Sequence, residues 1–244
     1  MPLVKICGLR DVASALVAIK SGADMIGMVF AESRRLVSPQ ECHDIISAIH
    51  EARRRPGPAS ILGPQRGEVS GRTWFHAWSE ALEDAVARYR PLVVGVFADQ
   101  SSDEVNEIAD VAALDLVQLS GGEPVELAER IERPVVLVQH VGPDTDPEDL
   151  AERTYPGPAA VLLDTASETA RGGTGESFDW SVASALAERL PIMMAGGLNV
   201  ENVKEAITSI SPWAVDVSSG VETNGSKDHD KIRNFIQKAK GANA

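Results

Sequence analysis

The sequence has little of three things: cysteine, long apolar runs and positive charge. Only two cysteines, Cys7 and Cys42, occur in 244 residues, which is too few for a disulfide framework in a chain of this length. No apolar run is long enough to span a bilayer, and the first residues carry no secretory pattern. We therefore expect a cytoplasmic protein that has no membrane partner and can keep a reduced thiol.

The shortage of positive charge limits the partners further. Lys and Arg number 23 against 36 Asp and Glu, and the formal net charge is -13. A field of this sign repels phosphate polymers, so a nucleic-acid partner is not expected. No metal is expected either, because metal-ligand spacing is absent among the five histidines, which are His43, His50, His76, His140 and His229.

What the sequence does contain is a regular alternation of short apolar segments and helical patterns. The segments predicted as strands are residues 3–7, 24–30, 91–97, 115–119, 135–139, 159–164, 192–195 and 214–217. Eight strands in strict βα order within about 200 to 250 residues favour a closed (β/α)8 barrel, the TIM barrel, over a doubly wound sheet. We predict that residues 1–244 form this barrel as a single domain.

Local signals place several helices. Ser38, Pro39 and Glu41 form a capping box, which predicts a helix from Pro39 to the arginine run at residues 53–55. A helix is also expected from Pro124, before the fifth strand.

Residues 56–88 predict an insertion between the second helix and the third strand. The stretch 56–72 is rich in Pro, Gly and Ser and is typical of a loop, whereas Trp74, Trp78 and Leu82 begin an apolar helical stripe that continues to Tyr89. A connection from a helix to the next strand lies at the amino-terminal face of a barrel. The insertion is therefore predicted to lie there, far from the chemistry.

The residues that end the strands should meet at the mouth of the barrel, where such folds bind substrates. Cys7 taken alone is more readily a small buried residue than a functional one. Asp164, at the end of the sixth strand, changes this interpretation, because a thiol and a carboxyl group on separate strands can act as a base and an acid. Lys5 faces the same side of the strand as Cys7 and could favour the thiolate. The predicted ring is completed by Arg35, Gln118, Gly196, Gly197, Ser218, Ser219 and Gly220.

The loops after the last two strands predict a phosphate site. Barrels commonly hold a phosphate there, where backbone N–H groups can approach the oxygens closely. Arg171–Gly175 matches neither a Walker loop nor a dinucleotide motif; we interpret it as a mobile cover beside Asp164. The residues predicted to bind phosphate are Gly196, Gly197, Ser218, Ser219 and Gly220.

Taken together, these motifs resemble the phosphoribosylanthranilate isomerases of tryptophan biosynthesis. The resemblance covers nearly the whole chain except about residues 56–88. It rests on Lys5-Ile6-Cys7-Gly8, Val117-Gln118-Leu119, Leu162-Leu163-Asp164-Thr165, Gly172-Gly173-Thr174-Gly175, Ala195-Gly196-Gly197-Leu198-Asn199 and Asp216-Val217-Ser218-Ser219-Gly220-Val221-Glu222.

The resemblance implies an Amadori rearrangement of N-(5-phosphoribosyl)anthranilate to 1-(o-carboxyphenylamino)-1-deoxyribulose 5-phosphate. It assigns Cys7 as general base and Asp164 as general acid, with Arg35 holding the anthranilate carboxylate. No cofactor is expected, the partner is a small phosphorylated substrate, and the protein is a monomer or a homodimer. The other substrate contacts expected are Gln118, Gly173, Gly175 and Asp216.

The chain departs from the family pattern at Ser120, where the family usually has a histidine, and at the insertion. One alternative function is the related sugar isomerase of histidine biosynthesis, or an enzyme that serves both pathways; these resemble the same barrel but carry Asp at the position of Cys7. A second alternative is a barrel that binds a phosphorylated ligand without catalysis, which the presence of both Cys7 and Asp164 disfavours.

Overall fold

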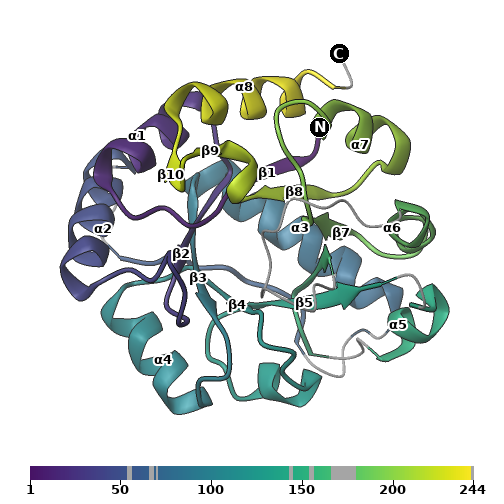
Figure 1. Cartoon of the computed structure of the whole chain (residues 1–244). Helices are drawn as coiled ribbons and strands as arrows, with labels where there is room; N and C mark the ends of the chain where they lie inside the picture. The colour runs from purple at the N-terminus through teal and green to yellow at the C-terminus, as the bar shows by residue number, and fades with distance from the viewer. Residues whose placement is uncertain are drawn as a thin grey trace.

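Eight parallel strands close into one barrel in sequence order, as the alternation predicts. The computed structural model describes residues 1–53, 57–65, 69, 71–142, 145–153, 157–165 and 180–242. Strand β1 pairs with both β2 and β8, which completes the ring seen in Figure 1. The predicted TIM barrel is thus confirmed. Its strands are β1 (Leu3–Ile6), β2 (Met25–Val29), β3 (Leu92–Phe97), β4 (Leu116–Leu119), β5 (Val135–Val141), β6 (Ala160–Thr165), β7 (Ile192–Met194) and β8 (Ala214–Val217).

The strands are apolar on both faces because each face is covered. Alternate residues, such as Leu92 and Val94 in β3, point into the barrel and form one buried cluster. The residues between them, such as Val93 in β3, belong to a second cluster that lies under the helices. This period of two decides which side chains can reach the mouth.

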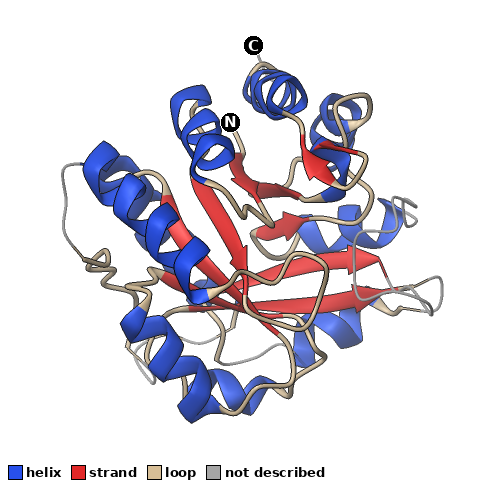
Figure 2. Cartoon of the chain, turned by 60° about the vertical axis from the view of Figure 1, so that its left-hand side comes forward, coloured by secondary structure: helices blue, strands red, loops and turns tan. Residues whose placement is uncertain are grey.

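The helices surround the barrel, as the turned view in Figure 2 shows. The predicted capping box is present, since Glu41 Oε2 accepts from the Ser38 N–H at 2.7 Å and Ser38 Oγ accepts from the Glu41 N–H at 3.2 Å. Within the described residues, no helix is both long and apolar enough to cross a membrane. The helices are α1 (Val12–Ser21), α2 (Pro39–Arg53), α3 (Arg72–Tyr89), α4 (Ser102–Val111), α5 (Pro147–Arg153), α6 (Trp180–Ala187), α7 (Val203–Ile210) and α8 (His229–Lys240).

The helix expected from Pro124 does not form as an α-helix. The chain instead forms a short 3-10 helix, η1 (Val125–Glu129). Asn106 holds the end of this segment, because its side chain donates to the Arg130 carbonyl and accepts from the Glu132 N–H. Pro134, directly before β5, also limits how far a helix could extend. The segment is therefore too short for an α-helix.

Helix α3 packs against the first residues of the strands. Its buried Leu82, Ala85 and Val86 belong to the same cluster as the interior of the barrel, and in Figure 1 the helix runs behind the strands. Near its start, Trp74 Nε1 donates to the Pro158 carbonyl at 2.8 Å. Leu82 and its neighbours thus close the barrel at one end with apolar side chains. That residues 56–88 are an insertion stays a prediction.

Candidate active site

The period of two brings polar residues to the carboxyl ends of the strands. In β1, Leu3 packs on the interior cluster, so Lys5 and Cys7 face the same way. The same alternation turns Gln118 in β4 and Asp164 in β6 inward. All of these side chains except Lys5 line one cavity, whose lining is Cys7, Val29, Ala31, Glu32, Ser33, Arg35, Val96, Ala98, Gln118, Ser120, His140, Asp164, Asp216 and Ser218.

Lys5 lies behind the lining of this cavity, in contact with Gln118 and Asp216, and joins three strands. Its side chain is only 1% exposed, and its Nζ donates to Gln118 Oε1 at 2.8 Å and to Asp216 Oδ1 at 3.0 Å. Burial alone would lower the pKa of Lys5, but the Asp216 carboxylate and Cys7 outweigh it and raise the pKa above its usual value. Lys5 is therefore a permanent cation beneath Cys7, and Gln118 and Asp216 are held in place by it.

Cys7 sits just above Lys5 and is 6% exposed. Burial raises the pKa of its thiol, and Asp216 adds to the rise, while the Lys5 and Lys227 cations oppose it. Burial is the largest of these effects. Cys7 thus rests as a thiol at neutral pH, which is a correction to the expectation that Lys5 by itself would produce the thiolate.

Arg35 is held by a residue to which the sequence analysis gave no role. Glu222, in the short hairpin of β9 (Glu222–Thr223) and β10 (Ser226–Lys227), accepts from Arg35 Nε at 2.8 Å and from Arg35 Nη2 at 3.2 Å. It also accepts from Arg34 at 2.8 Å and from Lys227 at 2.9 Å. Burial tends to raise the pKa of Glu222, but the hydrogen bonds and charges of Arg35 and Lys227 outweigh it and lower the pKa. Glu222 is therefore an ionised anchor that fixes the Arg35 guanidinium.

The hairpin also supports the loop after β8. Lys227 Nζ donates to the Ser218 carbonyl at 2.8 Å as well as to Glu222. Burial lowers the pKa of Lys227, although Glu222 partly offsets this. The β2 side of the mouth and the β8 loop are thereby joined through one buried ion-pair network.

The predicted phosphate residues lie together. A small cavity is lined by Gly196, Gly197, Ser218 and Ser219, with Asp164 and Asp216 at its edge. Gly196 and Gly197 have φ values of 70° and 73°, which favour glycine. A Cβ at Gly220 would lie 1.9 Å from the Leu198 carbonyl oxygen, so the two loops touch there and only glycine fits. Backbone groups of both loops therefore face one space.

Not every predicted site residue can be placed. Gly173, Gly175 and the rest of the expected cover at Arg171–Gly175 lie outside the described residues. Conversely, the structure places His140 in the cavity, together with Ser120. The period of two in β5, where Val136 and Val138 face inward, could have revealed His140.

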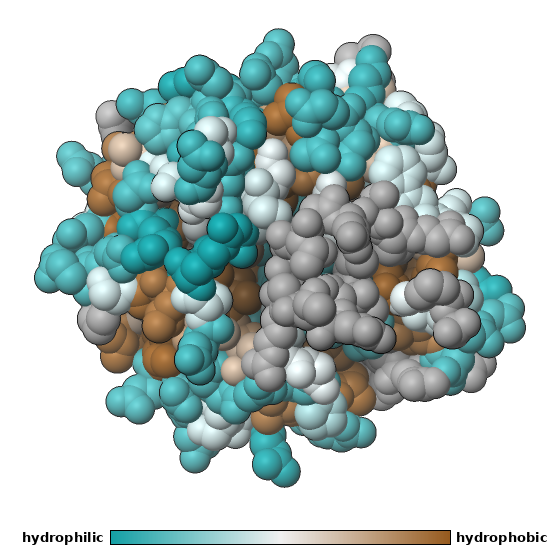
Figure 3. Space-filling view, viewed as in Figure 1, coloured by the Kyte–Doolittle hydropathy of each residue, from teal (hydrophilic) through white to brown (hydrophobic). Residues whose placement is uncertain are grey.

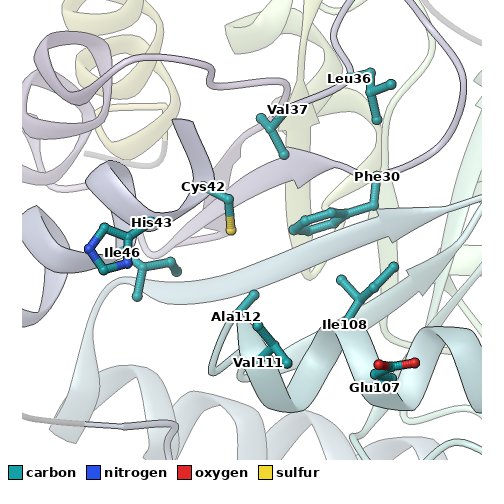
Figure 4. Close-up of a pocket in the computed structure, with 10 residues that line it drawn as sticks. All are labelled: Phe30, Leu36, Val37, Cys42, His43, Ile46, Glu107, Ile108, Val111 and Ala112. Carbon is teal, nitrogen blue, oxygen red and sulfur yellow. The ribbon is translucent and has the colours of Figure 1, made fainter. Parts of the chain in front are cut away.

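A second cavity lies outside the barrel and has a different character. It measures about 560 Å³ between α2 and α4, and its lining is mostly apolar (Figure 4), with His43 and Glu107 as the charged or polar members. Leu36 and Val111 at its rim are 44% and 85% exposed, and apolar surface shows between the two helices in Figure 3. Neither Cys7 nor Asp164, the predicted base and acid, lines it, so the mouth of the barrel is the candidate active site.

Comparison with known proteins identifies the family. A sequence model of N-(5'-phosphoribosyl)anthranilate (PRA) isomerase matches residues 47–238. The chain is 38% identical to N-(5'-phosphoribosyl)anthranilate isomerase of Dehalococcoides mccartyi, covering 98% of this chain and 95% of that protein. A multifunctional tryptophan biosynthesis protein of Phycomyces blakesleeanus is 39% identical over 98% of this chain, but the chain spans only 33% of its length. For the tryptophan biosynthesis protein TRP1 of Phytophthora nicotianae the chain spans 47%.

A solved structure with a bound ligand is similar as well. The phosphoribosyl anthranilate isomerase in complex with reduced 1-(o-carboxyphenylamino)-1-deoxyribulose 5-phosphate is 34% identical, with a TM-score of 0.70, over 99% of this chain and 100% of that one. The barrel, the family match and the nearly end-to-end bacterial relatives lead to one conclusion. The chain belongs to the N-(5'-phosphoribosyl)anthranilate isomerase family of tryptophan biosynthesis.

Proposed function

We propose that this chain converts N-(5-phosphoribosyl)anthranilate to 1-(o-carboxyphenylamino)-1-deoxyribulose 5-phosphate with Asp164 as general acid and Cys7 as general base. The observation that carries the proposal is that one cavity of a barrel of this family is lined by both groups, from β6 and from the end of β1. A carboxyl group and a thiol on separate strands can serve the two proton transfers that an aldose–ketose isomerisation needs.

The first transfer opens the sugar ring. Asp164 gives its proton to the ring oxygen, the bond between C1 and that oxygen breaks, and the nitrogen lone pair forms a C1=N double bond. The half-buried position of Asp164 at the mouth leaves it within reach of both solvent and substrate. The product of this step is an open-chain iminium ion.

The second transfer makes the new carbonyl. The Cys7 thiolate takes the proton from C2, and the C–H electrons move toward the nitrogen to give an enaminol, which becomes the ketone by losing the hydroxyl proton and gaining one at C1. Lys5 supports this step because its ammonium stabilises the thiolate. Since Cys7 rests as a thiol, it must release its proton to solvent before it can take the proton from C2.

The remaining residues hold the substrate. Arg35, fixed by Glu222, presents a guanidinium for the anthranilate carboxylate. Gln118 and Asp216 line the floor beneath the sugar, and Gly173 and Gly175 are assigned to the cover. The phosphate is assigned to the touching loops after β7 and β8, through Gly196, Gly197, Ser218, Ser219 and Gly220.

No cofactor enters this scheme, because both proton transfers use side chains. A Thermotoga maritima relative is described as dimeric, and a sedimentation measurement would decide between a monomer and a homodimer here. We also propose a cytoplasmic location for this step of tryptophan biosynthesis, which is in keeping with the two free cysteines.

A turnover assay tests the proposal. Freshly prepared phosphoribosylanthranilate is mixed with the purified chain, and the loss of its fluorescence is followed against a protein-free control. We expect enzyme-dependent conversion to the ketose. A folded chain that leaves the decay at the uncatalysed rate would contradict the proposal and favour a ligand-binding barrel, and turnover of the histidine-pathway sugar as well would indicate the bifunctional alternative.

A further inference from the structure

His140 stands at the mouth of the barrel without a role in the scheme above. It lies in β5 two residues after Val138 and four after Val136, both of which face the barrel interior. The alternation therefore turns its imidazole inward, and it lines the same cavity as Cys7 and Asp164. Its side chain is exposed, so it can exchange protons with water.

The immediate neighbour of His140 on one side is β4. The imidazole Nε2 lies 3.2 Å from the Ser120 carbonyl oxygen. A carbonyl oxygen only accepts, so Nε2 carries a proton in this contact. This hydrogen bond orients the ring and leaves Nδ1 as the nitrogen that can take up or release a proton.

On the other side lies β6, where His140 and Asp164 are register partners. Neighbouring strands are about 4.8 Å apart. Because both side chains turn into the same cavity from adjacent strands, the carboxyl group of Asp164 is the acid closest in register to His140.

The other charged groups that face this region are engaged elsewhere or lie on distant strands. Asp216 accepts from Lys5, and Arg35 is bound by Glu222. After β4, Glu123 accepts from the N–H groups of Asp99 and Gly121. Glu32 and Cys7 follow β2 and β1, whereas β6 is adjacent to β5 in the barrel. Among the described residues, Asp164 is therefore the partner that the geometry gives to His140.

We propose that His140 acts through Asp164 as the store of the proton that opens the sugar ring. An isolated carboxyl group normally ionises near pH 4, so it would seldom be protonated when the substrate arrives at neutral pH. Imidazole is a proton carrier suited to neutral pH, and His140 is the register partner of Asp164 on the neighbouring strand, so it can pass a proton to that carboxylate. The pair can thus hold a proton under conditions in which a lone aspartate would have lost it.

The proton balance closes over one turnover. The one proton that the pair holds passes from His140 Nδ1 to the Asp164 carboxylate and from there to the ring oxygen. His140 then takes a proton from solvent, while Cys7 returns to solvent the proton that it took from C2. No oxidant, reductant or further reactant is needed.

The inference rests on the proposed function, and its test separates the two. His140→Gln keeps a polar side chain but cannot store a proton, and Gln139→Ala, on the same strand and the opposite face, serves as the matched control. We expect His140→Gln to lower kcat about tenfold or more near pH 7.5 and only about twofold near pH 5.5, where protons from solvent are more abundant. The ratio to wild type at each pH cancels the titration of Cys7, which both proteins share. Added imidazole should restore part of the lost rate.

A His140→Gln variant with the wild-type rate at both pH values would overturn the inference. So would an equal loss at both pH values without imidazole rescue, since that pattern indicates a contact or a structural role. Wild-type turnover is measured in the same series, because its absence would contradict the proposed function and not the role of His140. Thermal unfolding of both variants checks that the fold is retained.

Discussion

The two ends of the barrel follow the same alternation of side chains but contain opposite chemistry. At the end where the strands begin, the inward residues are apolar, and Leu82 and Val86 of α3 pack onto them. At the end where the strands finish, the inward residues are ionisable, as Lys5 and Cys7 show. The comparison indicates that one end supplies stability and the other chemistry, and substitutions should separate these contributions.

The largest effect should come from the chemical end. Cys7→Ser and Asp164→Asn each remove one proton-transfer group while keeping its approximate size, and each should lower kcat by about 10²-fold or more. Their free energies of unfolding should change little. Steady-state kinetics and urea unfolding measure the two quantities, and near-normal turnover by either variant would remove that residue from the scheme.

The opposite pattern is expected at the apolar end. Leu82 is fully buried, and Leu82→Ala should lower the free energy of unfolding by about 2 to 5 kcal/mol through lost contacts and a cavity. The kcat of the molecules that remain folded should stay within about twofold of wild type. Unfolding by urea gives the first number and an active-site-titrated assay the second. A large loss of kcat in a stable variant would show that the two ends are coupled.

The pH dependence of kcat/KM tests the end of the barrel that holds Cys7. Because burial raises the pKa of Cys7, the thiolate fraction at neutral pH is smaller than for an ordinary thiol. In the pH range where ionisation of Cys7 limits the rate, kcat/KM should rise with pH by up to about tenfold per pH unit. It should still be rising at about pH 8.5, where a free thiol is half ionised. A pH profile measures this, and a plateau below pH 7 would mean that substrate or a neighbour has lowered the pKa of the thiol.

The smallest effect is expected at Glu222, which positions a binding residue. Glu222→Gln loosens Arg35, so KM should rise by roughly tenfold or less while kcat stays within about twofold. The pKa of Glu222 is lowered in the folded state, so its ion pairs contribute fully above the unfolded pKa and are lost as pH falls through the folded value. The stability difference between variant and wild type should therefore shrink in acid. Asp230→Asn, at an exposed ion pair on α8, is the control and should leave KM unchanged.

The strands were predictable because they are buried on both faces. Residues 91–97 and 214–217, for example, contain apolar runs that match β3 and β8 closely. The helix expected from Pro124 failed because its length is limited by Asn106, a residue on α4 that no local pattern connects to it. Local patterns therefore predict the elements, and contacts between distant segments correct their extent.

The active site also divides into features that local patterns predict and features that depend on distant contacts. Cys7 and Asp164 were predictable as strand ends, whereas the pairing of Arg35 with Glu222 joins residues 187 positions apart. No spacing rule predicts such a contact before the barrel is closed. The resting state of Cys7 was also out of reach, because it depends on how burial weighs against the surrounding charges.

The pairing of β1 with β8 has a consequence for the order of events during synthesis. The Cys7 N–H donates to the Val217 carbonyl at 2.9 Å, so the first strand of the barrel to be translated is completed by the eighth. The residue proposed as the base therefore cannot reach its final surroundings until nearly the whole barrel has been translated. A nascent chain arrested before β8 should expose Cys7 to alkylating reagents, and release of the full chain should protect it.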